Sequence, residues 1–188
     1  MTSPSTTRTV LARHPAGEGE IQLQQRQWPD GAVAYEIIAN GVFLMAIYNQ
    51  ISERALATWA LNATHADLTD DRRVLIGGLG MGFTLQAALA HDVAAVDVVE
   101  ISPHIVEWNH TYFADLNGDA LADPRVTLIQ DDLLQLQSTL AAASYAAILL
   151  DVDNGPSWLT YEANARLYTD AALQRWAHAL LPGGVFAV

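Results

Sequence analysis

Three glycines at every second position follow a short apolar segment near the middle of the chain. The segment reads VLIGGLGMGF over residues 74–83, so that Gly78, Gly80 and Gly82 form a G-x-G-x-G pattern. Glycine there permits a tight turn and lets a ligand lie against backbone N–H groups. Because the loop follows the first strand of the predicted sheet, where a doubly wound fold binds its ligand, we predict that these glycines line a cofactor.

Acidic residues end the next three predicted strands. They are Glu100 on the second strand, Asp131 and Asp132 on the third, and Asp151 and Asp153 on the fourth. A carboxylate at Glu100 can accept hydrogen bonds from both hydroxyls of a ribose. A carboxylate at the end of the third strand can accept from the amino group of adenine. Acids also favour strand ends and helix N-termini generally, but their recurrence on three consecutive strands points to a nucleoside site.

The glycine spacing favours S-adenosylmethionine over a dinucleotide. A dinucleotide fingerprint requires G-x-G-x-x-G, whereas a single residue separates Gly80 from Gly82. S-adenosylmethionine carries a ribose and an adenine but no phosphate, which agrees with the lack of Lys and Arg near the loop. Its sulfonium is a cation and therefore suits an acidic pocket.

Charge and composition exclude several classes of function. The net charge is −12, of which residues 74–188 carry −10, and the chain has neither Lys nor Cys. Such a surface repels phosphates, so nucleic acid is not an expected partner, and a small cationic amine is favoured. The absence of Cys excludes disulfides and thiolate catalysis. The histidines lack metal-ligand spacing, so no metal is expected.

The chain shows no targeting or membrane signal. No apolar run approaches the ~20 residues that a membrane span needs. The first 20 residues are polar and lack the apolar core of a secretory signal. We therefore expect a cytoplasmic protein that does not associate with a membrane.

The elements that position these residues alternate between strand and helix from residue 73 onward. Apolar strands are predicted at 73–78, 94–102, 125–132, 145–153 and 185–188, and helices at 82–92, 103–116, 133–143 and 160–181. This alternation is typical of an α/β fold with a doubly wound, mostly parallel sheet of the Rossmann-like type. Mid-helix Trp59, Trp108 and Trp176 are expected in the core.

The chain before the glycine loop has a different character. Residues 1–19 are expected to be a flexible lead-in, and 20–68 to form short antiparallel strands followed by a helix. The PDG at 29–31 and the NG at 40–41 are hairpin-type turn signals. A polar stretch near 65–72 marks the boundary to a Rossmann-like nucleoside-binding domain over 69–188.

Several segments occur in the order typical of the spermidine synthase family, the polyamine aminopropyltransferases, and the chain resembles that family over roughly residues 35–188. They are RVLIGGLGMGF, VDVVEISPHIVEWNHTYF, DPRVTLIQDDL, AAILLDVDNGP and LLPGGVFAV. The resemblance implies a class I methyltransferase fold and aminopropyl transfer from decarboxylated S-adenosylmethionine to a polyamine.

The resemblance also implies roles for individual residues. The three glycines would line the nucleoside, Glu100 with its neighbour Ile101 would hold the ribose, and Asp131 would hold the adenine. Asp132 stands next to it, where the family commonly has Gly. Asp151 matches the acid that orients and deprotonates the amine. Substrate contacts are assigned to Glu53, Asp153 and Trp158.

This sequence departs from the family pattern on the amine side. Gly80 stands where the family has an Asp that holds the aminopropyl ammonium, and only Glu53 remains of a Tyr-His-Glu motif at 51–53. Two alternatives therefore stand beside aminopropyl transfer. One is methyl transfer from intact S-adenosylmethionine, and the other is a non-catalytic nucleoside-binding homologue.

The sheet of this family has seven strands, and the present chain stops at Val188 on the fifth. The last strands are therefore expected to be missing, either because the sequence is a fragment or because another chain covers that edge. A homodimer is one such arrangement, since an open apolar edge favours association.

Overall fold

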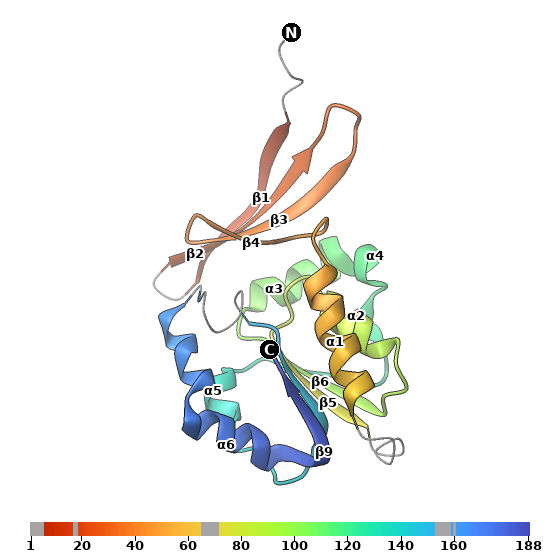
Figure 1. The fold of residues 1–188 in the computed structure, drawn as a ribbon. Coiled ribbons are helices and arrows are strands. Elements are labelled where there is room, and N and C mark those ends of the chain that lie inside the picture. The colour runs from red at the N-terminus through yellow and green to blue at the C-terminus, as the bar shows by residue number, and fades with distance from the viewer. Residues whose placement is uncertain (1–5, 17–18, 65–71, 153–158, 160) are drawn as a thin grey trace. The chain divides into compact units, whose positions relative to one another are not determined.

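The computed structural model describes residues 6–16, 19–64, 72–152, 159 and 161–188 (Figure 1). The chain divides into two compact units, Met1–Gln50 and Ile51–Val188. The division differs from the predicted one, because the first helix belongs to the second unit instead of the N-terminal strands.

The first unit is a four-stranded antiparallel sheet, and antiparallel strands are what the sequence predicts from residue 20 onward. Its strands are β1 (Thr7–Ala16), β2 (Gly19–Gln27), β3 (Val33–Ala39) and β4 (Val42–Ala46), in that spatial order. The NG signal forms the β3–β4 turn, where Asn40 and Gly41 have φ values of 53° and 76°. Positive φ at both central residues gives the twist that suits a two-residue hairpin.

Part of the expected lead-in is a strand. Thr7–Ala16 pair with β2 from Thr7 opposite Gln27 to Ala16 opposite Gly19, with one register shift between Val10 and Ala12. The polar composition of this segment suggested a flexible terminus, but pairing with a neighbouring strand outweighs composition.

The second unit contains a five-stranded parallel sheet. Its strands are β5 (Arg73–Gly77), β6 (Ala95–Val99), β7 (Val126–Ile129), β8 (Tyr145–Leu150) and β9 (Leu180–Ala187), and their order is β7-β6-β5-β8-β9. This doubly wound order confirms the predicted α/β class. The switch in strand order lies between β5 and β8, and a fold of this kind binds its ligand beside that point.

Helices flank the parallel sheet. They are α1 (Ile51–Ala63), α2 (Phe83–Leu89), α3 (Pro103–Trp108), α4 (Ala114–Asn117), α5 (Leu133–Leu136) and α6 (Asp170–Ala179). Figure 1 shows α1 and α2 on one side of the sheet and α5 and α6 on the other. Two predicted helices are shorter than expected, since α5 has one turn and a 3-10 segment at Glu162–Tyr168 precedes α6.

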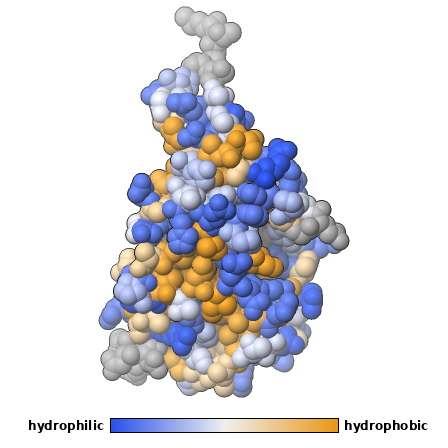
Figure 2. Space-filling view, turned by 180° about the vertical axis from the view of Figure 1, so that it is seen from behind, coloured by the Kyte–Doolittle hydropathy of each residue, from blue (hydrophilic) through white to orange (hydrophobic). Residues whose placement is uncertain are grey.

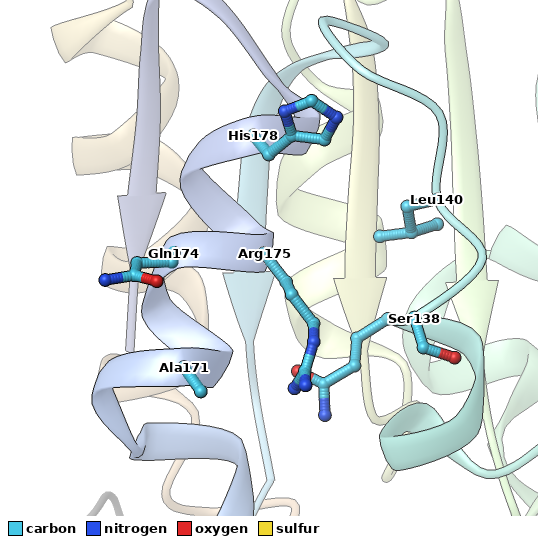
Figure 3. Close-up of a pocket in the computed structure, with 7 residues that line it drawn as sticks. Ser138, Leu140, Ala171, Gln174, Arg175 and His178 are labelled. Atoms are coloured by element: carbon cyan, nitrogen blue, oxygen red, sulfur yellow. The ribbon is translucent and has the colours of Figure 1, made fainter.

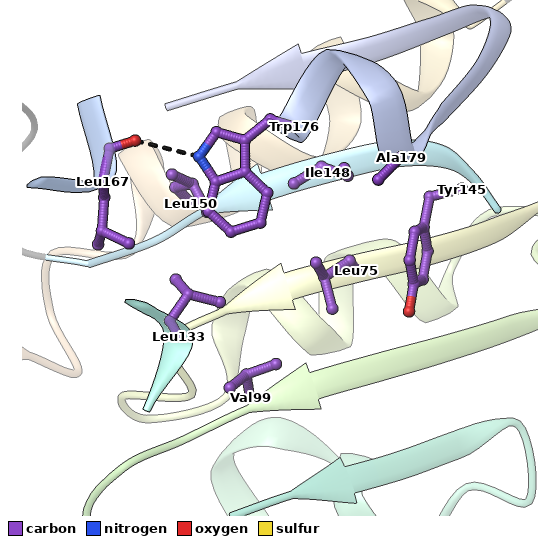
Figure 4. Packing of buried hydrophobic residues seen from close by; sticks show 9 residues of the cluster. All are labelled: Leu75, Val99, Leu133, Tyr145, Ile148, Leu150, Leu167, Trp176 and Ala179. Carbon is purple, nitrogen blue, oxygen red and sulfur yellow. Dashed lines mark hydrogen bonds between the residues drawn. The ribbon is translucent and has the colours of Figure 1, made fainter. Parts of the chain in front are cut away.

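The core on the α5–α6 side of the sheet is built around Trp176 (Figure 4). Its indole is fully buried, and its Nε1 donates a 3.0 Å hydrogen bond to the main-chain oxygen of Leu167. Trp108 is buried as well, as predicted. Trp59 is 75% exposed, so its predicted place in the core is wrong. The buried residues of α1 are Ala57, Ala60 and Leu61, which places Trp59 on the outer face.

A buried charge cluster joins three strands away from the glycine loop. The carboxylate of Asp97 accepts hydrogen bonds from Arg73 at 2.9 and 3.1 Å and from the Tyr145 hydroxyl at 2.7 Å. Burial and the bond to Asp97 raise the pKa of Tyr145 to about 12. The cluster therefore satisfies a carboxylate that is only 1% exposed, and it ties β5, β6 and β8 together.

The surface is mixed in character. Figure 2 shows one face on which apolar residues gather in a patch surrounded by hydrophilic ones. Within the described ranges, no helix has both the length and the apolar character that a membrane crossing requires.

Candidate functional site

The carboxyl ends of the parallel strands are held together by main-chain hydrogen bonds. The N–H of Asp151 donates to Gly77 across a distance of 2.7 Å, and that of Gly78 donates to Val99 across 2.8 Å. The end of β8, the glycine loop and the end of β6 are therefore in direct contact. The predicted site residues that follow these strands consequently share one edge of the sheet.

The glycine loop depends on glycine at two points for different reasons. Gly78 has φ 94°, and a Cβ there would collide with the main-chain carbonyl of Asp151. Gly82 has φ 80° and is buried, and a Cβ there would lie 2.6 Å from the side-chain nitrogen of Asn117. Gly78 and Gly80 are partly exposed at the edge. Gly82 is therefore buried against Asn117 within the loop, and its contact with the cofactor stays a prediction.

Two buried asparagines support the loop from behind. Asn109 Nδ2 donates to the Gly80 carbonyl at 2.8 Å, and Asn117 Nδ2 donates to the Met81 carbonyl at 3.0 Å. The same Asn117 nitrogen also donates to Asn109 Oδ1 at 2.9 Å. Both side chains are 2% exposed, so these bonds are shielded from water. They fix the direction in which the loop's peptide groups point.

A π-helical segment brings the two asparagines onto one face. Asn109–Phe113 form a π turn between α3 and α4, and such a turn contains one more residue than an α turn. Residues eight apart diverge on a regular α-helix, but the additional residue aligns them. Nothing in the sequence singles out this pair, because polar residues in an amphipathic helix usually face water.

Glu100 is a carboxylate that the backbone already holds in place. Its Oε2 accepts from the N–H of Leu79 at 3.0 Å, and its Oε1 accepts from the N–H of Ser102 at 2.8 Å. The side chain is 8% exposed, and burial raises its pKa although these hydrogen bonds lower it. The backbone N–H groups of Gly80 and Ile101 also act on this carboxylate, so the loop and the strand end hold Glu100 together.

The two acids at the end of β7 differ in their exposure and in their hydrogen-bond partners. Asp132 caps α5, since its Oδ1 accepts from the N–H of Leu134 at 2.8 Å. Asp131 is exposed, and its Oδ1 accepts from the N–H of Asp132 at 2.7 Å. Asp131 is therefore the better placed of the two to meet a ligand. Ile101, beside Glu100, is 67% exposed and offers an apolar contact at the same edge.

Asp151 interacts with a hydroxyl that the sequence interpretation overlooked. Thr84 Oγ1 lies 2.6 Å from Asp151 Oδ2 and 3.2 Å from the main-chain oxygen of Glu53. A hydroxyl has one proton, so the shorter contact to the carboxylate takes it. Burial raises the pKa of Asp151 to about 6, the Thr84 hydrogen bond opposes this rise, and the negative charge of Glu53 adds to it. Such a carboxylate can exchange a proton near neutral pH.

Glu53 lies in the first turn of α1, and its main-chain oxygen lies 3.2 Å from the Thr84 hydroxyl that donates to Asp151. Its own Oε2 accepts from the Ser52 hydroxyl at 2.8 Å. Thr84 lies two residues after Gly82 in the first turn of α2, and a single polar residue there carries no periodic signal that would have identified it. Two predicted substrate contacts, Asp153 and Trp158, lie outside the described residues.

Comparisons with known proteins give matches over much of the chain. Residues 50–188 match the spermine/spermidine synthase domain. Putrescine N-methyltransferase 3 of Nicotiana tabacum is 34% identical over 121 residues, which are 63% of this chain and 30% of that protein. The polyamine aminopropyltransferase of Prochlorococcus marinus subsp. pastoris is 29% identical over 115 residues, 61% of this chain and 39% of that protein. The matched region thus spans about a third of these relatives.

Solved structures show the same fold. A spermidine synthase in complex with the transition state analogue AdoDATO has a TM-score of 0.76 at 20% identity, covering 94% of this chain and 56% of that one. The spermidine synthase of Thermotoga maritima has a TM-score of 0.74 at 20% identity, with 94% and 55% covered. At this identity the likeness establishes the fold alone.

Proposed function

The chain belongs to the spermine/spermidine synthase family, and from this premise we propose that it transfers a methyl group from S-adenosylmethionine to a small amine. The matched relatives divide between methyl transfer and aminopropyl transfer in their names. The choice between the two reactions depends on which S-adenosyl nucleoside the site accepts.

The observation that carries the proposal is the contrast between Glu100 and the glycine loop. Glu100 offers a fixed carboxylate for the ribose, and Asp131 offers an exposed one for the adenine. The loop residues Leu79, Gly80 and Met81 include no acid for the ammonium of an aminopropyl group, and the side chains of Leu79 and Met81 are buried. A nucleoside site without that acid suits intact S-adenosylmethionine, because the methionine part of this cofactor still carries its own carboxylate.

The acceptor end of the site suits an amine. The Asp151 carboxylate lies beside Thr84 and the negative charge of Glu53 acts on it, and a cationic amine is held well by such a pair of carboxylates. An amine must lose its proton before its nitrogen can attack. With its pKa near 6, Asp151 can accept that proton at neutral pH, directly or through water.

The reaction then follows as an in-line displacement. The lone pair of the neutral amine nitrogen attacks the methyl carbon, the bond from that carbon to sulfur breaks, and its electrons remain on sulfur. S-adenosylhomocysteine leaves as a neutral thioether, the product leaves as the methylated ammonium, and the one proton that Asp151 took from the amine before the attack passes on to solvent. The role of the fold is to align the two reactants, which the glycine loop and Asp151 do from adjacent strand ends.

Aminopropyl transfer is the second candidate. It is supported by the match to a polyamine aminopropyltransferase and by the fold shared with spermidine synthases. It uses the same base and geometry, but the attacked carbon is the methylene beside the sulfur of decarboxylated S-adenosylmethionine, and methylthioadenosine leaves.

Calorimetric titration with the two nucleosides separates these candidates. We expect intact S-adenosylmethionine to bind more tightly than its decarboxylated form, and incubation with putrescine to yield S-adenosylhomocysteine. Tighter binding of the decarboxylated form, with methylthioadenosine as product, would establish the second candidate instead. If both nucleosides bind and neither yields product with any amine, the chain is a nucleoside-binding homologue without turnover.

A further inference from the structure

A groove between α5 and α6 lies apart from the candidate site. Its volume is about 320 Å³. The residues that line it are Gln137, Ser138, Leu140, Ala171, Gln174, Arg175 and His178 (Figure 3). None of them is among the residues assigned to the nucleoside or to the amine, so any ligand of the groove is a separate one.

The groove has a positively charged wall in an acidic unit. Arg175 and His178 are three residues apart on α6, so they lie on the same side of the helix. Figure 3 shows Arg175 extending from α6 toward the segment that carries Ser138 and Leu140. Within the described ranges, its guanidinium has no carboxylate within 4 Å and makes no hydrogen bond, whereas Arg73 and Arg125 each pair with an acid.

A buried amide in the groove lacks a partner for its oxygen. Gln137 is 5% exposed, and its Nε2 donates to the Leu134 carbonyl at 3.3 Å. Its Oε1 is buried and accepts no hydrogen bond from the described part of the chain. A buried acceptor without a donor is unfavourable, so a ligand that supplies an O–H or N–H here gains affinity.

Together these groups define the chemistry of a ligand. The guanidinium of Arg175 favours a carboxylate, with which it can form two parallel hydrogen bonds. The orphan Oε1 of Gln137 requires a donor close to that carboxylate. The excess of acids in this unit disfavours ligands with several negative charges. We propose that the groove binds a 2-hydroxycarboxylate monoanion, with Arg175 on the carboxylate and Gln137 accepting from the hydroxyl.

The test compares L-lactate with propanoate, which differ by the hydroxyl alone. Each is titrated into the isotopically labelled 188-residue protein, and the backbone amide signals of residues 137–140 and 171–178 are followed by NMR. We expect lactate to bind about fivefold more tightly than propanoate, as one additional neutral hydrogen bond predicts. Equal affinities, or shifts scattered away from the groove, would overturn the proposal.

Two variants assign the contacts. Arg175→Gln removes the charge from an exposed position, and we expect both ligands to weaken at least tenfold. Arg166→Gln is the matched control, because Arg166 is also exposed and makes no ion pair within the described part of the chain. Gln137→Met should remove only the preference for lactate. If Arg175→Gln and Arg166→Gln weaken binding equally, the groove is not the site.

Discussion

The hydroxyl of Thr84 lies 2.6 Å from Oδ2 of Asp151, although 67 residues separate the two in the chain. The contact joins the first turn of α2 to the end of β8. A hydroxyl that donates to a carboxylate stabilises its ionised form and so opposes the rise in pKa that burial causes. Thr84 therefore sets how readily Asp151 takes up a proton.

Thr84→Val should move the acid limb of the pH–rate profile upward. Valine keeps the shape of threonine but cannot donate, so the pKa of Asp151 should rise above its value of about 6. If the ionised carboxylate is the active form, kcat/KM increases with pH through this pKa, and the limb should shift by about one pH unit. Thr84→Ser keeps the hydroxyl and should leave the limb in place. An unmoved limb in both variants would mean that Asp151 is not the group that titrates.

Asp151→Asn should abolish turnover and yet stabilise the protein at neutral pH. Losing a general base costs about 100-fold or more in rate. Burial raises the pKa of Asp151 above its unfolded value, so ionisation of this carboxyl group opposes folding. The penalty is absent below a pH of about 4 and reaches its full size above a pH of about 6. We expect stabilisation on the order of 2 kcal/mol at pH 7.5, and none at pH 4, in urea unfolding. A variant less stable than the parent at pH 7.5 would contradict this reasoning.

Substitutions of the neighbouring acids Asp131 and Asp132 should differ in their effect on the affinity for the nucleoside. Asp131→Asn should weaken S-adenosylhomocysteine binding about tenfold, because the exposed acceptor for the adenine loses its charge and a hydrogen bond to a charged group is the stronger one. Asp132→Asn should change the affinity less than about twofold, because asparagine caps a helix as well as aspartate does. Calorimetric titration measures both values. The reverse order would reassign the adenine contact to Asp132.

Gly82→Ala and Gly118→Ala form a matched pair with similar backbone conformations, at φ 80° and 71°. Each alanine meets the left-handed strain of about 1–2 kcal/mol. Only at Gly82 does the new methyl also meet Asn117, at 2.6 Å, whereas at Gly118 the nearest atom is 3.4 Å away. We expect Gly82→Ala, but not Gly118→Ala, to weaken nucleoside binding and to lower the free energy of unfolding by more than about 2 kcal/mol. Equal effects in both variants would mean that the asparagine support of the loop is unimportant.

The cluster around Asp97 should affect stability and leave binding unchanged. Tyr145→Phe removes one of three hydrogen bonds to that carboxylate and should cost about 1 kcal/mol. Arg73→Ala leaves a buried charge without its cation and should cost about 3 kcal/mol. Urea unfolding gives both values. A change in nucleoside affinity greater than twofold in either variant would indicate coupling to the distant site.

The residues at the carboxyl ends of the parallel strands were the easiest to predict. Parallel strands bring their carboxyl ends to one edge whatever the details of packing, so the sequence placed Glu100 and Asp131 correctly at that edge. The fold class followed from the same alternation. Segment lengths were less predictable, because one turn of α5 and the 3-10 segment before α6 are set by tertiary packing and not by local propensity.

The supporting polar groups could not be found from the sequence. Thr84, Asn109 and Asn117 act through contacts between segments that are distant in the chain, and single polar residues carry no periodic signal. Trp59, in contrast, was predicted to be a core residue and is exposed. A large apolar side chain suggested the core, but the phase of the α1 helix turns it outward.

The two backbone amides that hold Glu100 have a thermodynamic consequence for the ligand. An exposed glutamate side chain that moves freely loses rotamer entropy when it binds a ribose, which typically costs about 0.5–1.5 kcal/mol of binding free energy. Glu100 is already immobilised by Leu79 and Ser102 when the protein folds. Capture of a nucleoside therefore freezes almost no motion at this residue, and the enthalpy of the new hydrogen bonds is retained in the affinity.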